Sequence, residues 1–182
     1  KMDKILPLIE HGHLDFGENK VQEAIDKWTE IKGKRPNIQL HMIGKLQTNK
    51  VKFAVSLFDY IHSVDSEKLA KKIADEQNKI NKKIKIFLQV NIGNEDQKSG
   101  INQDNLNQLI SYCKGIGLDL VGLMCIPPAN IDPESYFVEM QKINKSQGFS
   151  ELSMGMSSDF LKAAEYSSTY IRIGSKIFGQ RY

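Results

Sequence analysis

Short apolar segments alternate with longer amphipathic segments along the whole chain, and this alternation predicts the secondary structure. The short segments are rich in β-branched and aromatic residues, which is typical of buried strands. Because the predicted strands alternate with helices, the pattern indicates an α/β protein built from parallel βα units. We predict seven strands, over residues 13–19, 38–44, 60–65, 85–93, 118–128, 151–157 and 168–179.

The segments between these strands carry the signals of amphipathic helices. Apolar side chains recur at helical spacing from Val21 to Ile31. A second helix is expected to begin after Ser66, because serine is a good N-cap, and Pro133 favours the first turn of another. The chain itself opens with a helical pattern that runs to Gly12.

Two architectures accommodate this order of elements, an open doubly wound sheet and a TIM-type (β/α)8 barrel. Several predicted strands end in polar or glycine-bearing turns. That spread favours the barrel, whose active face collects residues from many strand ends, over the open sheet with its one switch point. Because a helix precedes the first of only seven predicted strands, we expect the first barrel strand to be missing from this chain. Without a linker or a shift in composition, residues 1–182 are expected to form one domain.

Composition and charge narrow the class of protein further. The chain is 40% hydrophobic and 26% charged, as in ordinary soluble proteins, and its net charge of +3 is too small to indicate a nucleic-acid partner. Cys113 and Cys125 have no metal-ligand spacing and suggest no disulfide framework. No apolar run approaches a membrane span, and no signal peptide is recognised. We therefore expect a cytoplasmic protein with neither nucleic acid nor membrane as partner.

Two predicted loops near the end of the chain combine glycine and serine in a way that suits phosphate. If the missing strand is counted as the first, these loops follow strands seven and eight, where barrels commonly bind phosphate. Gly155 and Gly174 allow a close approach of the backbone, while Ser157 and Ser175 offer hydroxyl groups. Ordinary turns are the alternative interpretation.

Arg172 lies within an apolar strand pattern and needs a partner, because a buried unpaired charge is costly. It precedes Gly174 by two residues, so it could reach a ring attached to a phosphate in that loop. The alternative is an internal ion pair with an acidic residue such as Glu18. His41 and His62 have no metal-ligand partner at useful spacing, so we expect both to be hydrogen-bonded core residues.

Several longer motifs occur together and in order along essentially the whole chain. They are FGENKVQEA, HMIGKLQTNK, IHSVDS, QVNIG, KSGI, GLMCIPP, LSMGMSSDF and IRIGSKIFGQR. With these motifs the chain resembles the YggS/PROSC family, the pyridoxal-phosphate homeostasis proteins. The resemblance implies the barrel of the alanine racemase class without the second domain of that enzyme.

The resemblance also implies roles for five residues of this chain. Asn19 matches the asparagine close to the phenolic oxygen of pyridoxal 5'-phosphate (PLP), and Arg172 matches the arginine that faces the pyridine nitrogen. Ser157, Gly174 and Ser175 match the phosphate cradle, although serine stands at 175 where threonine is more usual.

One feature of the family has no counterpart in this sequence. The family attaches its cofactor to a lysine in a VSK-like stretch at the end of the first strand, and no such stretch is present. Lys1 and Lys4 lie in or beside the first predicted helix, so neither is expected to replace that lysine. Lys98 matches a lysine on a loop near the cofactor, where a secondary role and a solvated loop position are both open.

The resemblance implies a PLP-binding protein of vitamin B6 homeostasis without robust catalytic turnover. Arginine stays protonated and can only donate to a pyridine nitrogen, which makes the cofactor a poor electron sink. The alternatives are a PLP-dependent racemase-like enzyme and a phosphate-binding barrel isomerase. The family implies a monomer, and exposed strand edges could allow association.

Overall fold

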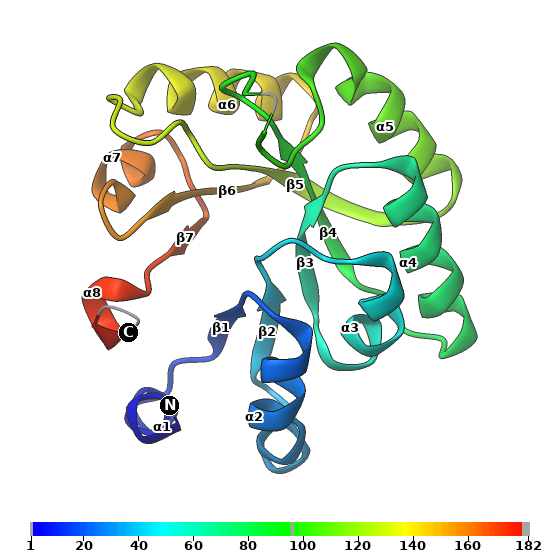
Figure 1. Ribbon diagram of the computed structural model, residues 1–182, viewed down its shortest axis with the longest axis vertical. Coiled ribbons are helices and arrows are strands. Elements are labelled where there is room, and N and C mark those ends of the chain that lie inside the picture. Colours follow the sequence, from blue (N-terminus) through cyan, green and yellow to red (C-terminus); the bar gives the residue numbers. More distant parts are fainter. Residues whose placement is uncertain (1, 96, 180–182) are drawn as a thin grey trace.

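The structure is a computed structural model that describes residues 2–95 and 97–179. Seven parallel strands form one sheet in which sequential strands are neighbours (Figure 1). The strands are β1 (Asp15–Glu18), β2 (Gln39–Met42), β3 (Tyr60–Val64), β4 (Lys85–Val90), β5 (Asp119–Cys125), β6 (Glu151–Met156) and β7 (Tyr170–Arg172). The seven strands of the sequence pattern are therefore confirmed, each within its predicted range.

Helices connect the strands and lie outside the curved sheet (Figure 1). They are α1 (Met2–Glu10), α2 (Val21–Lys34), η1 (Thr48–Lys50), α3 (Val51–Leu57), α4 (Glu67–Lys79), α5 (Gln103–Gly115), α6 (Glu134–Ser146), α7 (Phe160–Glu165) and α8 (Ser175–Phe178). None of the described helices is long and apolar enough to cross a membrane.

The sheet curls into a nearly closed barrel, so the fold class of an α/β, TIM-type barrel is confirmed. Within the described residues, β1 and β7 each pair with a neighbour on one side only, and an opening separates them (Figure 1). The sequence pattern had placed a missing strand at this point. Helices α1 and α8 lie near the opening, where the Lys4 ammonium donates to the Phe178 carbonyl at 2.6 Å.

Helix formation follows the local signals of the sequence. In α2 the side chains of Val21, Ala24 and Trp28 are buried, as their helical spacing predicts. The Ser66 hydroxyl accepts a hydrogen bond from the Leu69 N–H at the start of α4, which confirms the predicted N-cap.

The last predicted strand, over residues 168–179, is wrong beyond Arg172. Strand β6 ends at Met156, which is the register partner of Arg172, so the chain has no ladder partner after this point. The N–H groups of Ile177 and Phe178 bond instead to the Gly174 carbonyl, at 3.0 and 2.8 Å, and start α8. The sequence pattern predicts a buried strand over this whole segment, but the Ile177 side chain within it is 53% exposed.

Candidate ligand-binding site at the carboxyl ends of the strands

Because all seven strands are parallel, the residues that follow them gather at one end of the barrel. Asn19 comes directly after β1, while Ser157 follows β6 and Gly174 and Ser175 follow β7. Arg172 is the last residue of β7. The five residues predicted from the sequence therefore share one end of the barrel, at or directly after the ends of strands β1, β6 and β7.

Gly44 holds the position of Asn19, and the sequence reasoning missed this role. A Cβ atom on Gly44 would lie 2.3 Å from the Asn19 carbonyl oxygen and 2.7 Å from its Cα. Only glycine permits this approach between the chain after β2 and the chain after β1. The signal in the sequence is the glycine that ends the apolar run HMIG.

The two loops predicted to bind phosphate are joined directly. The Gly174 N–H donates to the Ser157 hydroxyl at 3.2 Å. Gly155 has φ +92°, and a Cβ there would lie 2.6 Å from the Ala163 Cβ, so α7 packs closely against β6. The Met156 N–H donates to Asp159 at 2.6 Å, which fixes the turn that carries Ser157.

Gly155 allows a close contact between two elements, whereas Gly174 leaves open space. The Gly174 φ of −122° is open to any residue, and a Cβ would meet no described atom within 4 Å. Glycine therefore leaves free space beside the exposed Ser175 rather than a tight backbone contact. A phosphate fits this combination of open space, hydroxyl groups and N–H donors at the start of α8.

Arg172 is held by the barrel interior and makes no pair with Glu18. Its Nη1 donates to the Ser153 hydroxyl at 2.7 Å and its Nη2 donates to the Cys125 carbonyl at 2.8 Å. Glu18 instead accepts from Lys27 at 3.0 Å and from the Trp28 indole at 2.8 Å. The ion-pair alternative for Arg172 is therefore wrong.

These two bonds fix the guanidinium and leave its other N–H groups without an acceptor among the described residues. Burial lowers the pKa of Arg172, but arginine stays protonated at any usable pH. Burial also raises the pKa of the neighbouring Cys125 thiol to about 12, so this thiol adds no charge. The site therefore presents a fixed cationic donor next to the loops of Ser157 and Gly174.

Both predicted core histidines are buried and hydrogen-bonded, as expected. His41 Nδ1 lies 3.0 Å from His62 Nε2, and His41 Nε2 lies 3.1 Å from Asp15. His62 Nδ1 lies 2.9 Å from the Ser153 hydroxyl that also binds Arg172. Burial lowers the pKa of both histidines, and for His62 the nearby Arg172 charge lowers it further.

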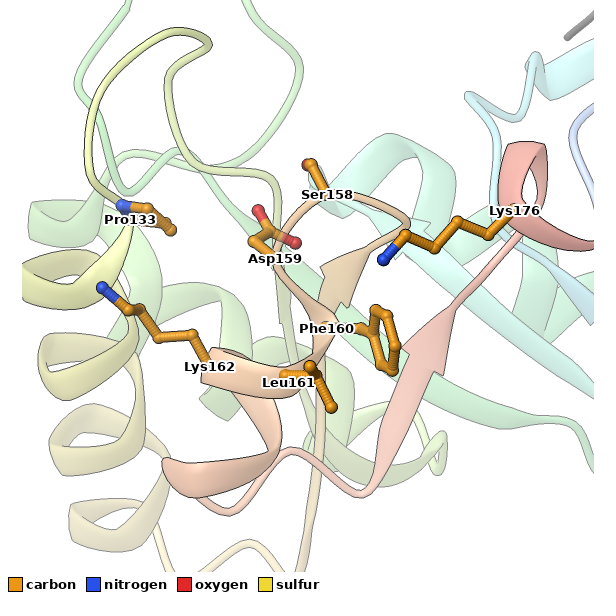
Figure 2. A pocket seen from close by; sticks show the side chains of 7 residues that line it. All are labelled: Pro133, Ser158, Asp159, Phe160, Leu161, Lys162 and Lys176. Carbon is orange, nitrogen blue, oxygen red and sulfur yellow. The ribbon is translucent and has the colours of Figure 1, made fainter.

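A cavity of about 300 Å³ lies beside the same loops but contains none of the predicted site residues (Figure 2). In it the Lys176 ammonium lies over the Phe160 ring, 4.9 Å from the ring centre. The cavity is lined by Pro133, Ser158, Asp159, Phe160, Leu161, Lys162 and Lys176. It therefore lies on the flank of the Ser157 loop, next to the predicted site.

Lys4 and Lys98, two of the lysines considered from the sequence, have partners within the protein. Lys4 lies on α1 and bonds to Phe178, as described above, while Lys1 lies outside the described residues. Lys98 pairs with Glu95 at 2.5 Å and donates to the Pro127 carbonyl at 3.3 Å, so it belongs to the loop after β4.

The parallel barrel and the polar residues at its strand ends define the class of protein. A family model described as "Alanine racemase, N-terminal domain" matches residues 1–182. The structure of PipY from Synechococcus elongatus with PLP bound has a TM-score of 0.88 to this chain and 33% sequence identity. It covers 96% of this chain, which in turn covers 86% of PipY.

Curated relatives place the chain more narrowly. It is 36% identical to the pyridoxal phosphate homeostasis protein of Aquifex aeolicus, over 91% of this chain and 76% of the relative. The protein of the same name from Vibrio cholerae is 36% identical, over 99% of this chain and 81% of the relative. The chain therefore belongs to the pyridoxal phosphate homeostasis protein family, within the alanine racemase N-terminal domain class.

Proposed function

We propose that this chain binds PLP at the carboxyl ends of its strands and serves in PLP homeostasis in the cytoplasm. The observation that carries the proposal is the placement of Arg172. Its guanidinium is fixed at the end of β7, beside the joined loops of Ser157 and Gly174. A ring nitrogen and a phosphate on one small molecule match this pair of features.

The residues divide into three roles under this proposal. The hydroxyl groups of Ser157 and Ser175 donate to the phosphate, while Gly174 completes the cradle by leaving open space beside them and by joining its loop to Ser157. Arg172 donates a hydrogen bond to the pyridine nitrogen, and Asn19 lies near the phenolic oxygen. The names of the relatives and the PLP-bound PipY structure support this assignment.

We also propose that the chain has no robust turnover of amino acids. When bound, PLP supplies an electron sink, and that sink is strongest when the pyridine nitrogen is protonated. Arg172 can only donate, so it keeps the nitrogen unprotonated. The relatives are named as homeostasis proteins, which agrees with a carrier.

Residues 1–182 act as one PLP-binding domain in this proposal, because the described strands share one sheet. The protein acts as a monomer, and the edges of β1 and β7, which have no strand partner among the described residues, allow weak association. Neither nucleic acid nor membrane is a partner, which fits the net charge of +3.

Titration with PLP and with pyridoxal, which lacks the phosphate, tests the proposal. We expect PLP to bind at least about tenfold more tightly than pyridoxal, because charge-assisted hydrogen bonds contribute about 1.5–3 kcal/mol each. Incubation of the loaded protein with single alanine enantiomers should give no racemisation. Equal affinity for the two compounds would contradict the phosphate site, and rapid racemisation would favour the racemase-like alternative.

A further inference from the structure

A chain of hydrogen bonds crosses the interior of the barrel and ends at Arg172. It starts at Asp15 on β1 and passes through His41 on β2 and His62 on β3. From His62 it continues to Ser153 on β6, and from there to Arg172 on β7. The four heavy-atom distances lie between 2.7 and 3.1 Å, so every step has the length of a good hydrogen bond.

The two ends of this hydrogen-bond network, Asp15 and Arg172, fix the direction of every hydrogen bond in it. A carboxylate only accepts, so the His41 Nε2 carries the proton that faces Asp15. A neutral imidazole has one N–H, so His41 Nδ1 accepts from His62 Nε2. His62 Nδ1 then accepts the hydroxyl proton of Ser153. The Ser153 oxygen is thereby left with free lone pairs for Arg172, which only donates.

The surroundings of the two histidines favour this neutral arrangement. His41 is stacked on Tyr60 at 4.2 Å between ring centres, and His62 is stacked on Phe87 at the same distance. The charges that act on His41 are Asp15, Asp59 and Lys32, while His62 faces Arg172 and His41. Burial lowers the pKa of both histidines, so each keeps a single ring proton near neutral pH.

We propose that Asp15, His41, His62 and Ser153 are positioning residues that hold Arg172 as a donor toward the ring nitrogen of the ligand. This inference rests on the proposed PLP site. If the hydrogen bonds ran in the opposite direction, both histidines would carry their proton on Nδ1. The unprotonated His41 Nε2 would then face the Asp15 carboxylate, and neither atom could donate. The observed contacts therefore support one direction only. In that direction the hydroxyl proton of Ser153 turns away from Arg172, and the guanidinium keeps one orientation.

Nitrogen NMR of the histidines in the ligand-free protein tests the hydrogen-bond network independently of PLP binding. We expect His41 and His62 both to show a protonated Nε2 and an unprotonated Nδ1 at neutral pH. The exposed His11 and His13 supply reference signals in the same spectrum. A proton on Nδ1 of either buried histidine, or a charged ring, would overturn the proposal.

The link to Arg172 is tested with PLP and 1-deaza-PLP, in which a C–H group replaces the ring nitrogen. The unmodified protein should prefer PLP by about tenfold or more, because the bond to Arg172 is charge-assisted. In Ser153→Ala this preference should fall by about fivefold, since the guanidinium loses a hydrogen bond that orients it. Ser63→Ala is the matched control, because Ser63 is also buried on a barrel strand and its hydroxyl has no hydrogen-bond partner.

The outcomes separate this inference from the proposed function. An unchanged preference in Ser153→Ala, or the same loss in Ser63→Ala, would overturn the positioning role while PLP binding stands. Failure of the unmodified protein to bind either compound would contradict the PLP site and, with it, this role for Arg172. His62→Phe gives a second test of the link, since it keeps an aromatic ring beside Phe87 and removes both hydrogen bonds. The preference for PLP should fall as in Ser153→Ala, and an unchanged preference would overturn the positioning role.

Discussion

The Gly174 N–H donates to the Ser157 hydroxyl at 3.2 Å, across 17 positions of the sequence, and so joins the loops after β6 and β7. This bond sets the spacing of the hydroxyl and backbone groups that the proposed phosphate site needs. It also brings the site next to Arg172, which lies two residues before Gly174.

Ser157→Ala is expected to weaken PLP binding by about tenfold, because the hydroxyl contributes about one hydrogen bond to the site and orders the Gly174 loop. The affinity is measured by titration with PLP, followed by fluorescence. Ser158→Ala is the control, since this neighbouring side chain is exposed and lines the flanking cavity. Equal affinities for the two variants would contradict the role of Ser157.

Gly44→Ala should destabilise the fold by about 1–3 kcal/mol, because the new Cβ would overlap the Asn19 backbone at 2.3 Å. The free energy of unfolding is measured with denaturant, and PLP affinity should fall with it as Asn19 shifts. Gly33→Ala in α2 is the matched control, since a Cβ there meets nothing within 4 Å. Helix propensity makes that change neutral or stabilising by up to about 1 kcal/mol. A fully stable Gly44→Ala would show that the Asn19 segment is free to move.

Stability should fall as the pH drops from about 7 to about 5. Burial lowers the pKa of His41 and His62 below the usual value of 6.5, so the folded protein keeps both neutral. The unfolded chain takes up these protons first, and the free energy of unfolding therefore decreases toward acid. His62→Gln should flatten the pH profile. A stability that stays constant or rises over this range would contradict the prediction.

The effect of Glu76 is separable from that of the histidines. Hydrogen bonds from Lys72 and Lys79 lower the pKa of the Glu76 carboxyl to about 2. Its contribution to stability is present above the unfolded value of 4.5 and is lost only as the pH falls from there toward 2. Measurements between about pH 5 and 7 therefore report on the histidines.

Reduction with borohydride in the presence of PLP should leave no pyridoxyl adduct on Lys4. The Lys4 ammonium is bonded to the Phe178 carbonyl at 2.6 Å, outside the strand ends that carry the proposed site. We make the same prediction for Lys1, which lies outside the described residues. Peptide mass mapping checks both. An adduct on either lysine would show that the start of this chain supplies the covalent lysine of the family.

Association of the chain should increase with concentration and involve the open edge of β7. Ile171 is 41% exposed on this edge, and a charged side chain there opposes pairing with another strand. Ile171→Lys should therefore reduce the average mass seen by sedimentation at high concentration. Phe53→Lys, at a 49% exposed position of α3, is the control and should leave the mass unchanged. Equal masses for all three proteins would argue against edge association.

Local patterns in the sequence were enough to predict the order of elements and the family. The spacing of apolar residues is a local property, so it predicted the seven strands and the helices between them, and parallel pairing placed Asn19, Ser157 and Ser175 at one end. The secondary structure of residues 173–179 could not be predicted from the local sequence. Ile177 and Phe178 have strand-forming side chains, but β6 ends at Met156, and without a ladder partner the chain turns into α8.

The partners of Arg172 depend on the folded arrangement of the strands. Ser153, His62, His41 and Asp15 belong to four different strands, and His62 and Ser153 lie 91 positions apart. No spacing along the chain links them, because their contacts depend on how far the sheet curls and on which side chains face inward. Closing the barrel brings His41, His62 and Ser153 together away from water, where each must find a hydrogen-bond partner. This requirement joins them to Arg172 at one end and to the half-exposed Asp15 at the other.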